Sequence, residues 1–148
     1  MSPKAPIGYI DIRVFAHATE DSDKVLTAAR NIIPPGLADT VAFNKKDLTG
    51  HHGNPITLFE ARLKEKNLVN AVFEKLCTGL SMLDKKVLTD EINRRLDKGN
   101  LYMRLDKQSA YLNEFKLGST DPIHMRIHFK RHDAEGVFDS CRKFGLLP

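Results

Sequence analysis

The clearest pattern in the sequence is the strict alternation of apolar and polar residues between Ile123 and Lys130. Every second position is apolar, and the positions between them carry His124, Arg126 and His128. Alternation with a period of two predicts a strand with one face in the core and the other in water. Strands of this kind are typical of antiparallel sheets, because the strands of a parallel sheet are usually apolar on both faces.

Four more segments have the character of strands. Apolar and polar residues alternate over residues 8–18, 56–66 and 100–106, and a more polar strand is expected near residues 40–48. In the first of these, Ile10, Ile12 and Val14 alternate with Asp11 and Arg13. The sheet is therefore expected to have one apolar face and one charged face.

Helical spacing of apolar residues predicts four helices between and after these strands. The first follows Thr19, carries acids in its first turn and ends at Pro34-Pro35-Gly36. Asn67 is expected to cap the second helix, and Asp133 is expected to cap the last.

The third predicted helix begins at Ser81 and stops at Gly99, because glycine favours the backbone conformation that ends a helix. Its expected inward residues recur at helical spacing and are Leu83, Val87, Leu88, Ile92 and Leu96. Residues 107–115 are expected to form a turn followed by irregular structure.

Interleaved helices and amphipathic strands predict an α+β fold, with a single, mostly antiparallel sheet and helices packed on one face. The 148 residues fit one domain over 1–148, with residues 1–7 expected to be flexible. No apolar run has the roughly 20 residues of a membrane span, and no secretory signal is visible, so we expect a cytoplasmic protein without a membrane partner. Cys77 and Cys141 are expected to be buried free thiols.

The positive charge of the chain is concentrated in its second half. The formal net charge is +4, yet basic and acidic residues balance at nine each through Glu74. Residues 122–132 hold three basic residues and three histidines with no acid. A polyanion would be attracted to this segment first.

The solvent face of the predicted sheet is the candidate RNA-binding surface. Single-stranded RNA needs cations for its phosphates and aromatic rings for its unpaired bases. The expected residues of this face are Arg13, His17, Arg62, Lys64, Arg104, Arg126, His128 and Lys130, with Tyr9, Phe15 and Tyr102 among them. Solvent-facing strand positions are often charged without any ligand, and Asp11, Glu60 and Asp106 could pair with these cations.

Motifs for metal binding or catalysis are missing from the sequence. His124 and His128 share a strand face but lie roughly 13 Å apart, which is too far for one zinc ion. There is no nucleophile elbow, P-loop or dinucleotide fingerprint. We expect no metal, no cofactor and no enzymatic activity, although active sites can converge in space without a sequence motif.

Three stretches carry a resemblance to a known family: residues 15–21 (FAHATED), 50–56 (GHHGNPI) and 100–112 (NLYMRLDKQSAYL). Together they resemble an archaeal family of small proteins described as RNA-binding proteins or predicted exosome subunits. The resemblance implies a fold similar to that of the ribosomal protein of the large subunit that binds 5S RNA. It also implies RNA as the partner, and a role in RNA processing or degradation alongside exosome or RNase P proteins.

By their positions in these stretches, the resemblance adds further candidates for RNA contact. Those within the quoted motifs are His17, His51, Asn54, Arg104, Lys107 and Gln108. Asp106 is expected to orient a turn. The alternative function is a protein-interaction subunit of an RNA-processing complex without direct RNA contact. Its expected mark is an exposed apolar patch near the C-terminus, made of Phe138, Phe144, Leu146 and Leu147.

Overall fold

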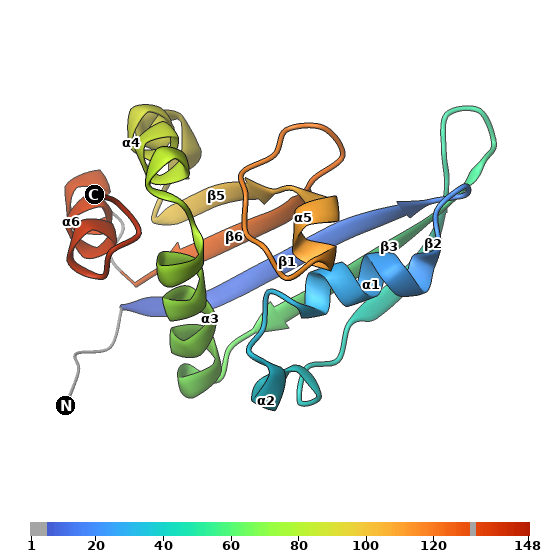
Figure 1. Cartoon of the computed structure of the whole chain (residues 1–148), viewed down its shortest axis with the longest axis horizontal. Helices are drawn as coiled ribbons and strands as arrows, with labels where there is room; N and C mark the ends of the chain where they lie inside the picture. Colours follow the sequence, from blue (N-terminus) through green and yellow to red (C-terminus); the bar gives the residue numbers. More distant parts are fainter. Residues whose placement is uncertain (1–5, 131–132) are drawn as a thin grey trace.

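The computed structural model describes residues 6–130 and 133–148. The segments with alternating apolar and polar residues form strands of one antiparallel sheet. Within this part of the chain the sheet has six strands in the order β2-β3-β1-β6-β5-β4 (Figure 1). The strands are β1 (Ile7–His17), β2 (Asn44–Thr49), β3 (Pro55–Leu63), β4 (Leu96–Asp97), β5 (Asn100–Leu105) and β6 (Ile123–Phe129). Every pairing is antiparallel, which confirms the predicted α+β class and sheet type.

The helices pack on one face of the sheet and at its edge. They are α1 (Ser22–Arg30), α2 (Pro35–Ala38), α3 (Lys66–Gly79), α4 (Met82–Arg95), α5 (Lys107–Tyr111) and α6 (Ala134–Lys143). In Figure 1, α1, α3 and α5 lie in front of the sheet, so its other face is turned away from the viewer. None of the helices in the described part of the chain combines the length and apolarity that a membrane span requires.

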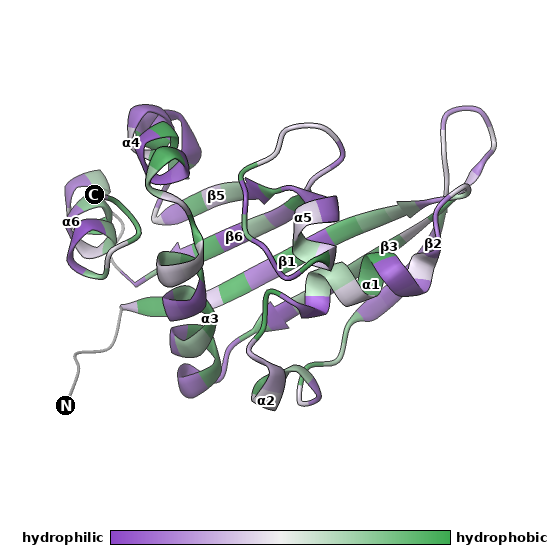
Figure 2. Ribbon diagram, in the orientation of Figure 1, coloured by the Kyte–Doolittle hydropathy of each residue, from purple (hydrophilic) through white to green (hydrophobic). Residues whose placement is uncertain are grey.

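The core lies between this helical layer and the central strands. Ile10, Ile12 and Val14 of β1 are fully buried, as are Ile127 and Phe129 of β6. Figure 2 shows hydrophobic and hydrophilic residues alternating along the strands. The predicted alternation is therefore confirmed, and the charged side chains are left on the face that the helices do not cover.

Two helices begin at positions that differ from the expected ones. Helix α1 was expected to follow Thr19 directly, but it begins at Ser22 after Asp21, whose carboxylate accepts a hydrogen bond from the Asp23 N–H. Helix α3 is capped by Glu65, which accepts from two backbone N–H groups, and not by Asn67. In both cases a carboxylate competes successfully for the positive end of the helix.

Other boundaries also shift. Helix α1 ends at Arg30, ahead of the prolines, and Pro35 opens the short helix α2. Gly99 does not end helix α4. With Lys98 it adopts positive φ in the tight turn that joins β4 to β5, a type of turn that suits the twist of a hairpin.

The segment expected to be irregular after β5 contains helix α5, because the Asp106 carboxylate accepts hydrogen bonds from both the N–H and the hydroxyl of Ser109. Asp106 thus orients the turn, as the sequence predicted. At the other end of the chain, Ile7 already pairs with Phe129, while residues 1–5 lie outside the described part.

The apolar surface is placed differently from the prediction. Leu146 and Leu147 are buried, and Phe138 and Phe144 pack against the core, so the expected patch near the C-terminus is not exposed. Conversely, Leu83 and Val87, which were predicted to face inward, are 72% and 39% exposed. With Met82 (58% exposed) they form an apolar strip along α4. Strand β5 contacts α4 through the side that carries Leu88 and Ile92 instead.

Candidate nucleic-acid interface

The centre of the open sheet face is an ion-paired triad. Strand register places Asp11 of β1 opposite Arg62 of β3 on one side and Arg126 of β6 on the other. Arg62 Nε lies 2.8 Å from Asp11 Oδ1, and Arg126 Nε lies 3.1 Å from Asp11 Oδ2. Burial acts to raise the pKa of Asp11, but the hydrogen bonds and charges of the two arginines outweigh it and hold that pKa below its usual value.

The triad predicts acid-sensitive stability. Because the folded pKa of Asp11 lies below its unfolded value of about 3.9, this pairing stabilises the protein above roughly pH 4 and is lost as pH falls through the folded pKa. We expect Asp11→Asn to lower stability at pH 7 and to reduce the stability change between pH 4 and pH 2. Urea unfolding of both proteins at several pH values measures this. Parallel pH profiles for the two proteins would contradict the prediction.

The Tyr9 ring is enclosed by neighbouring side chains. The His128 ring stacks on it with centroids 4.6 Å apart, and the Arg62 guanidinium lies 4.1 Å from its centroid. His128 Nδ1 is 2.8 Å from Asn100 Oδ1, which requires the ring nitrogen to donate to that carbonyl. Arg62, Arg126 and His128 are therefore on the predicted face, but much of their bonding capacity is used within the protein.

A second row across the sheet holds arginines outside the ion pairs of the described residues, because Glu60, which lies opposite Arg13 on β3, pairs with Lys46 instead. Register aligns Arg13 of β1 with His124 of β6, and His124 with Arg104 of β5. Both arginines are exposed, and among the described residues neither forms an ion pair within 4.0 Å. Burial and the charges of Arg13 and Arg104 lower the pKa of His124. This row is positively charged, and its two guanidinium groups can donate hydrogen bonds to phosphate oxygens.

Three adjoining hollows run across the open face. One of about 280 Å³ over β1 and β3 shares Asp11, Arg13 and Arg126 with a second of about 340 Å³. The second shares Tyr102 and His124 with a third, of about 530 Å³, beside α4. Three strand spacings, about 14 Å, separate β3 from β5. The hollows thus form a continuous shallow groove perpendicular to the strands.

Tyr102 is the accessible aromatic ring of this groove. Its side chain is 40% exposed and lines both the second and the third hollow. Phe15 is less available, since it is half-buried with the Arg13 guanidinium 5.6 Å from its centroid and the His124 ring against its edge. A base entering the groove would meet Tyr102 first.

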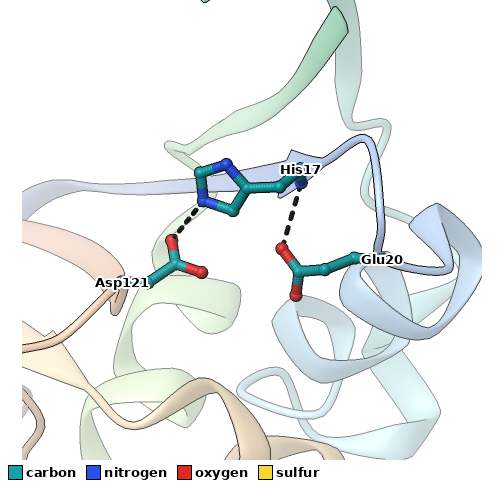
Figure 3. Close-up of side chains that lie close together, drawn as sticks. All are labelled: His17, Glu20 and Asp121. Atoms are coloured by element: carbon teal, nitrogen blue, oxygen red, sulfur yellow. Dashed lines mark hydrogen bonds and ion pairs between the residues drawn. The ribbon is translucent and has the colours of Figure 1, made fainter. Parts of the chain in front are cut away.

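Two predicted contact residues, His17 and Lys107, lie together in a different place, at the end of β1. His17 Nε2 lies 3.0 Å from Asp121 Oδ1, and the Glu20 carboxylate accepts from the His17 N–H at 3.0 Å (Figure 3). The Lys107 ammonium donates to both carboxylates and to the carbonyl of Phe15. The side chain of Lys107 is only 13% exposed, so its charge is used to join these segments.

This cluster also has the composition of a metal site. Ligand atoms of His17, Glu20 and Asp121 all lie within 4.8 Å of one another. However, Lys107 Nζ is 2.7 Å from Asp121 Oδ2 and 3.1 Å from Glu20 Oε1, so a cation already balances both carboxylates. A divalent ion would have to displace that ammonium group, and the arrangement favours a structural ion-pair network.

The remaining predicted residues lie at the margins. His51 and Asn54 are exposed in the loop between β2 and β3, which Figure 1 shows extending beyond the end of the sheet. Gln108 is exposed on α5, and Lys64 and Lys130 are exposed just past the ends of β3 and β6. Arg131 and His132, which belong to the basic segment in the sequence, lie outside the described residues.

Sequence reasoning missed the contribution of helix α4. Glu91, Arg94 and Arg95 line the largest hollow together with Tyr102 and Arg104. The signal available in the sequence was the pair of arginines in the last turn of the predicted helix. Only the packing of α4 against β5 brings that turn to the margin of the open face.

Two comparisons with known proteins, one with family models and one with individual relatives, both find proteins described as RNA binding. The sequence model of a family described as RNA binding matches residues 9–129. The RNA-binding protein PAB1135 of Pyrococcus abyssi is 38% identical over 133 residues, covering 88% of this chain and 86% of that protein. Two solved structures are similar along nearly their whole length. Mth689, a DUF54 protein from Methanothermobacter thermautotrophicus, is 30% identical with a TM-score of 0.76, and the superposition covers 94% of this chain and 98% of that structure. Protein AF2318 from Archaeglobus fulgidus is 26% identical with a TM-score of 0.78, and the superposition covers 93% of this chain and 99% of that structure.

Proposed function

We propose that this chain, which belongs to the RNA-binding family, holds single-stranded RNA in the groove across the open face of its sheet. The observation that carries the proposal is the coincidence of unpaired arginines with one accessible aromatic ring. Arg13 and Arg104 can neutralise phosphates, and Tyr102 can stack on a base. The length of the groove across the sheet matches that of sheet platforms on which two or three bases stack.

The salt dependence of binding tests the electrostatic part of this proposal. We expect Arg13→Ala combined with Arg104→Ala to weaken binding to all RNA sequences alike. Two lost phosphate contacts should reduce the slope of log K against log salt by roughly 1.4 to 1.8. Fluorescence anisotropy of a labelled unstructured RNA at several salt concentrations measures both quantities.

A matched control for this double variant removes two exposed lysines from elsewhere, Lys24 on α1 and Lys86 on α4. Lys24→Ala with Lys86→Ala makes the same change in net charge and should leave the slope nearly unchanged. Equal losses in the two double variants would mean that only the total charge of the protein matters, and the groove would then not be the binding site.

We also propose that the protein binds RNA without cleaving it. Among the described residues, the three hollows contain one histidine, His124, and three carboxylates, those of Asp11, Glu60 and Glu91. Each of these carboxylates is ion-paired with a basic side chain, so none is a free general base for cleavage through the 2′-hydroxyl of RNA. Both described thiols are buried, which raises the pKa of Cys77 to about 11 and that of Cys141 to about 12, so they stay protonated and unreactive. Incubation of end-labelled RNA with the protein, with and without Mg²⁺, tests this; accumulation of shorter products would refute it.

For the cellular role, we propose an accessory factor in RNA processing or degradation that acts with exosome or RNase P proteins. The support is the resemblance of the three sequence stretches to predicted exosome subunits. We propose equally that the sheet corresponds to that of the ribosomal protein that binds 5S RNA, which superposition of the two structures tests.

A second candidate function, a protein-interaction subunit, is favoured by one observation: the exposed apolar strip of Met82, Leu83 and Val87 on α4. We expect Leu83→Glu to abolish binding to purified exosome or RNase P proteins in the absence of RNA, while RNA affinity stays within about two-fold, since surface substitutions rarely perturb the fold. Isothermal titration of wild-type and variant protein measures this. Failure of the wild-type protein to bind either partner would leave RNA binding as the better-supported function.

A further inference from the structure

The largest hollow on the open face differs from the other two in its charge and in its wall. Three arginines reach it, Arg94 and Arg95 from the last turn of α4 and Arg104 from β5, against one carboxylate, that of Glu91. Each of the other two hollows contains Asp11, one of them also contains Glu60, and each has one net positive charge among its arginines and carboxylates. The hollow beside α4 therefore carries two net positive charges among these four side chains, and α4 forms its wall.

The arginines of this hollow are placed by Glu91. The Glu91 carboxylate accepts from Arg95 Nε at 2.8 Å and lies 3.6 Å from an Arg94 guanidinium nitrogen. These bonds hold the Arg95 side chain, which is only 23% exposed, against the helix. Arg94, at 79% exposed, and Arg104 remain accessible to an anion. Guanidinium groups bind phosphate oxygens through paired hydrogen bonds, so this grouping suits a phosphate better than a base edge.

We infer that this hollow is a subsite for the terminal phosphate of an RNA strand, an inference that rests on the proposed binding of RNA along the groove. An internal phosphodiester carries one negative charge, whereas a terminal phosphomonoester carries about 1.5 to 2 near pH 7. The net charge of the hollow matches the terminal group. Its volume of about 530 Å³ also lies within the range of small-ligand sites.

The position of the hollow supports the same assignment. The groove continues from it across β6 and β1 to β3, but on its other side stands α4. A strand lying in the groove would therefore end or turn away at this point. With its last base against Tyr102, the terminal phosphate would face Arg94 and Arg104.

The experiment compares three versions of one unstructured RNA of eight nucleotides, labelled on an internal base: hydroxyl groups at both ends, a 5′-phosphate, or a 3′-phosphate. We expect wild-type protein to bind one phosphorylated form about ten-fold more tightly than the hydroxyl form, the effect of roughly one added charge facing three partly exposed guanidinium groups. The form that is preferred identifies the end that the hollow holds. Equal affinity for all three forms overturns the inference while leaving RNA binding intact. Absence of binding at low salt overturns the proposed function as well.

Variants of α4 assign the preference to the hollow. Arg94→Gln combined with Arg95→Gln should abolish the preference for the phosphorylated end. Lys85→Gln combined with Lys86→Gln changes the charge of the same helix equally and should preserve it. Glu91→Gln keeps an acceptor for Arg95 but removes the negative charge, so it should strengthen the preference several-fold. A preference that survives the loss of both arginines, or that does not increase in Glu91→Gln, places the phosphate elsewhere and overturns the inference.

Discussion

Replacing Tyr102 by alanine is expected to weaken binding of single-stranded RNA by about 1–3 kcal/mol, which is roughly 5- to 150-fold in Kd. Tyr102 presents an exposed ring to two of the three hollows, and nothing else in the described part of the groove offers an equally accessible aromatic surface. Because stacking involves the face of any base, the loss should be similar for different sequences. The salt slope should hardly change, since no phosphate contact is removed.

Tyr111 provides the control for this substitution. It is 37% exposed, close to the 40% of Tyr102, but it lies on α5, in the helical layer. Tyr111→Ala removes the same ring and should leave RNA affinity unchanged. Anisotropy titrations of both variants, with thermal unfolding to verify folding, measure the difference. If Tyr111→Ala weakens binding as much as Tyr102→Ala does, the RNA does not lie on the open face.

Replacing Lys107 by methionine is expected to lower the free energy of unfolding by roughly 2–3 kcal/mol, because it leaves the Glu20 and Asp121 carboxylates close together without their cation. The value is below that of a fully buried pair, since the two carboxylates are partly exposed. For a chain of this size the melting temperature should fall by about 5–10 °C. Burial acts to raise the pKa of Asp121, but its bonds to Lys107 and His17 lower it overall, which is consistent with this role for Lys107.

This prediction also separates two interpretations of Lys107. The family resemblance implies RNA contact, whereas the structure shows the ammonium group bonded to three acceptors within the protein. A structural role predicts an unchanged salt slope for RNA binding well below the melting temperature of the variant. A slope reduced by about 0.7–0.9 would instead show that Lys107 contacts a phosphate. Lys86→Met, at an exposed position with the same loss of charge, should leave the melting temperature nearly unchanged.

The boundaries that the sequence mispredicted share a cause. The first helix does not follow Thr19 directly and Asn67 does not cap α3, because these helices begin where the Asp21 and Glu65 carboxylates can reach free backbone N–H groups. Which capping residue is used depends on where the preceding strand ends, and the strand ends are set by pairing with distant segments. The choice between neighbouring candidates is therefore a tertiary one.

The candidate site was predictable in its strands and not beyond them. Alternation in β1, β5 and β6 was enough to place Arg13, Tyr102 and Arg104 on one face. It could not show that Asp11 would form ion pairs with both Arg62 and Arg126, because pairing depends on strand order as well as on facing direction. Nor could it bring Arg94 to the groove.

The sequence by itself determined the class of fold and the charged face of the sheet. Both follow from periods of two and 3.6 residues, which are local properties of the backbone and need no knowledge of distant contacts. Tertiary structure alone decided which cations stay available, where α4 places its arginines, and which candidate residues are used in the His17, Glu20, Lys107 and Asp121 cluster. These outcomes depend on which strands become neighbours, and the free energy of that pairing is spread over contacts between residues far apart in the chain.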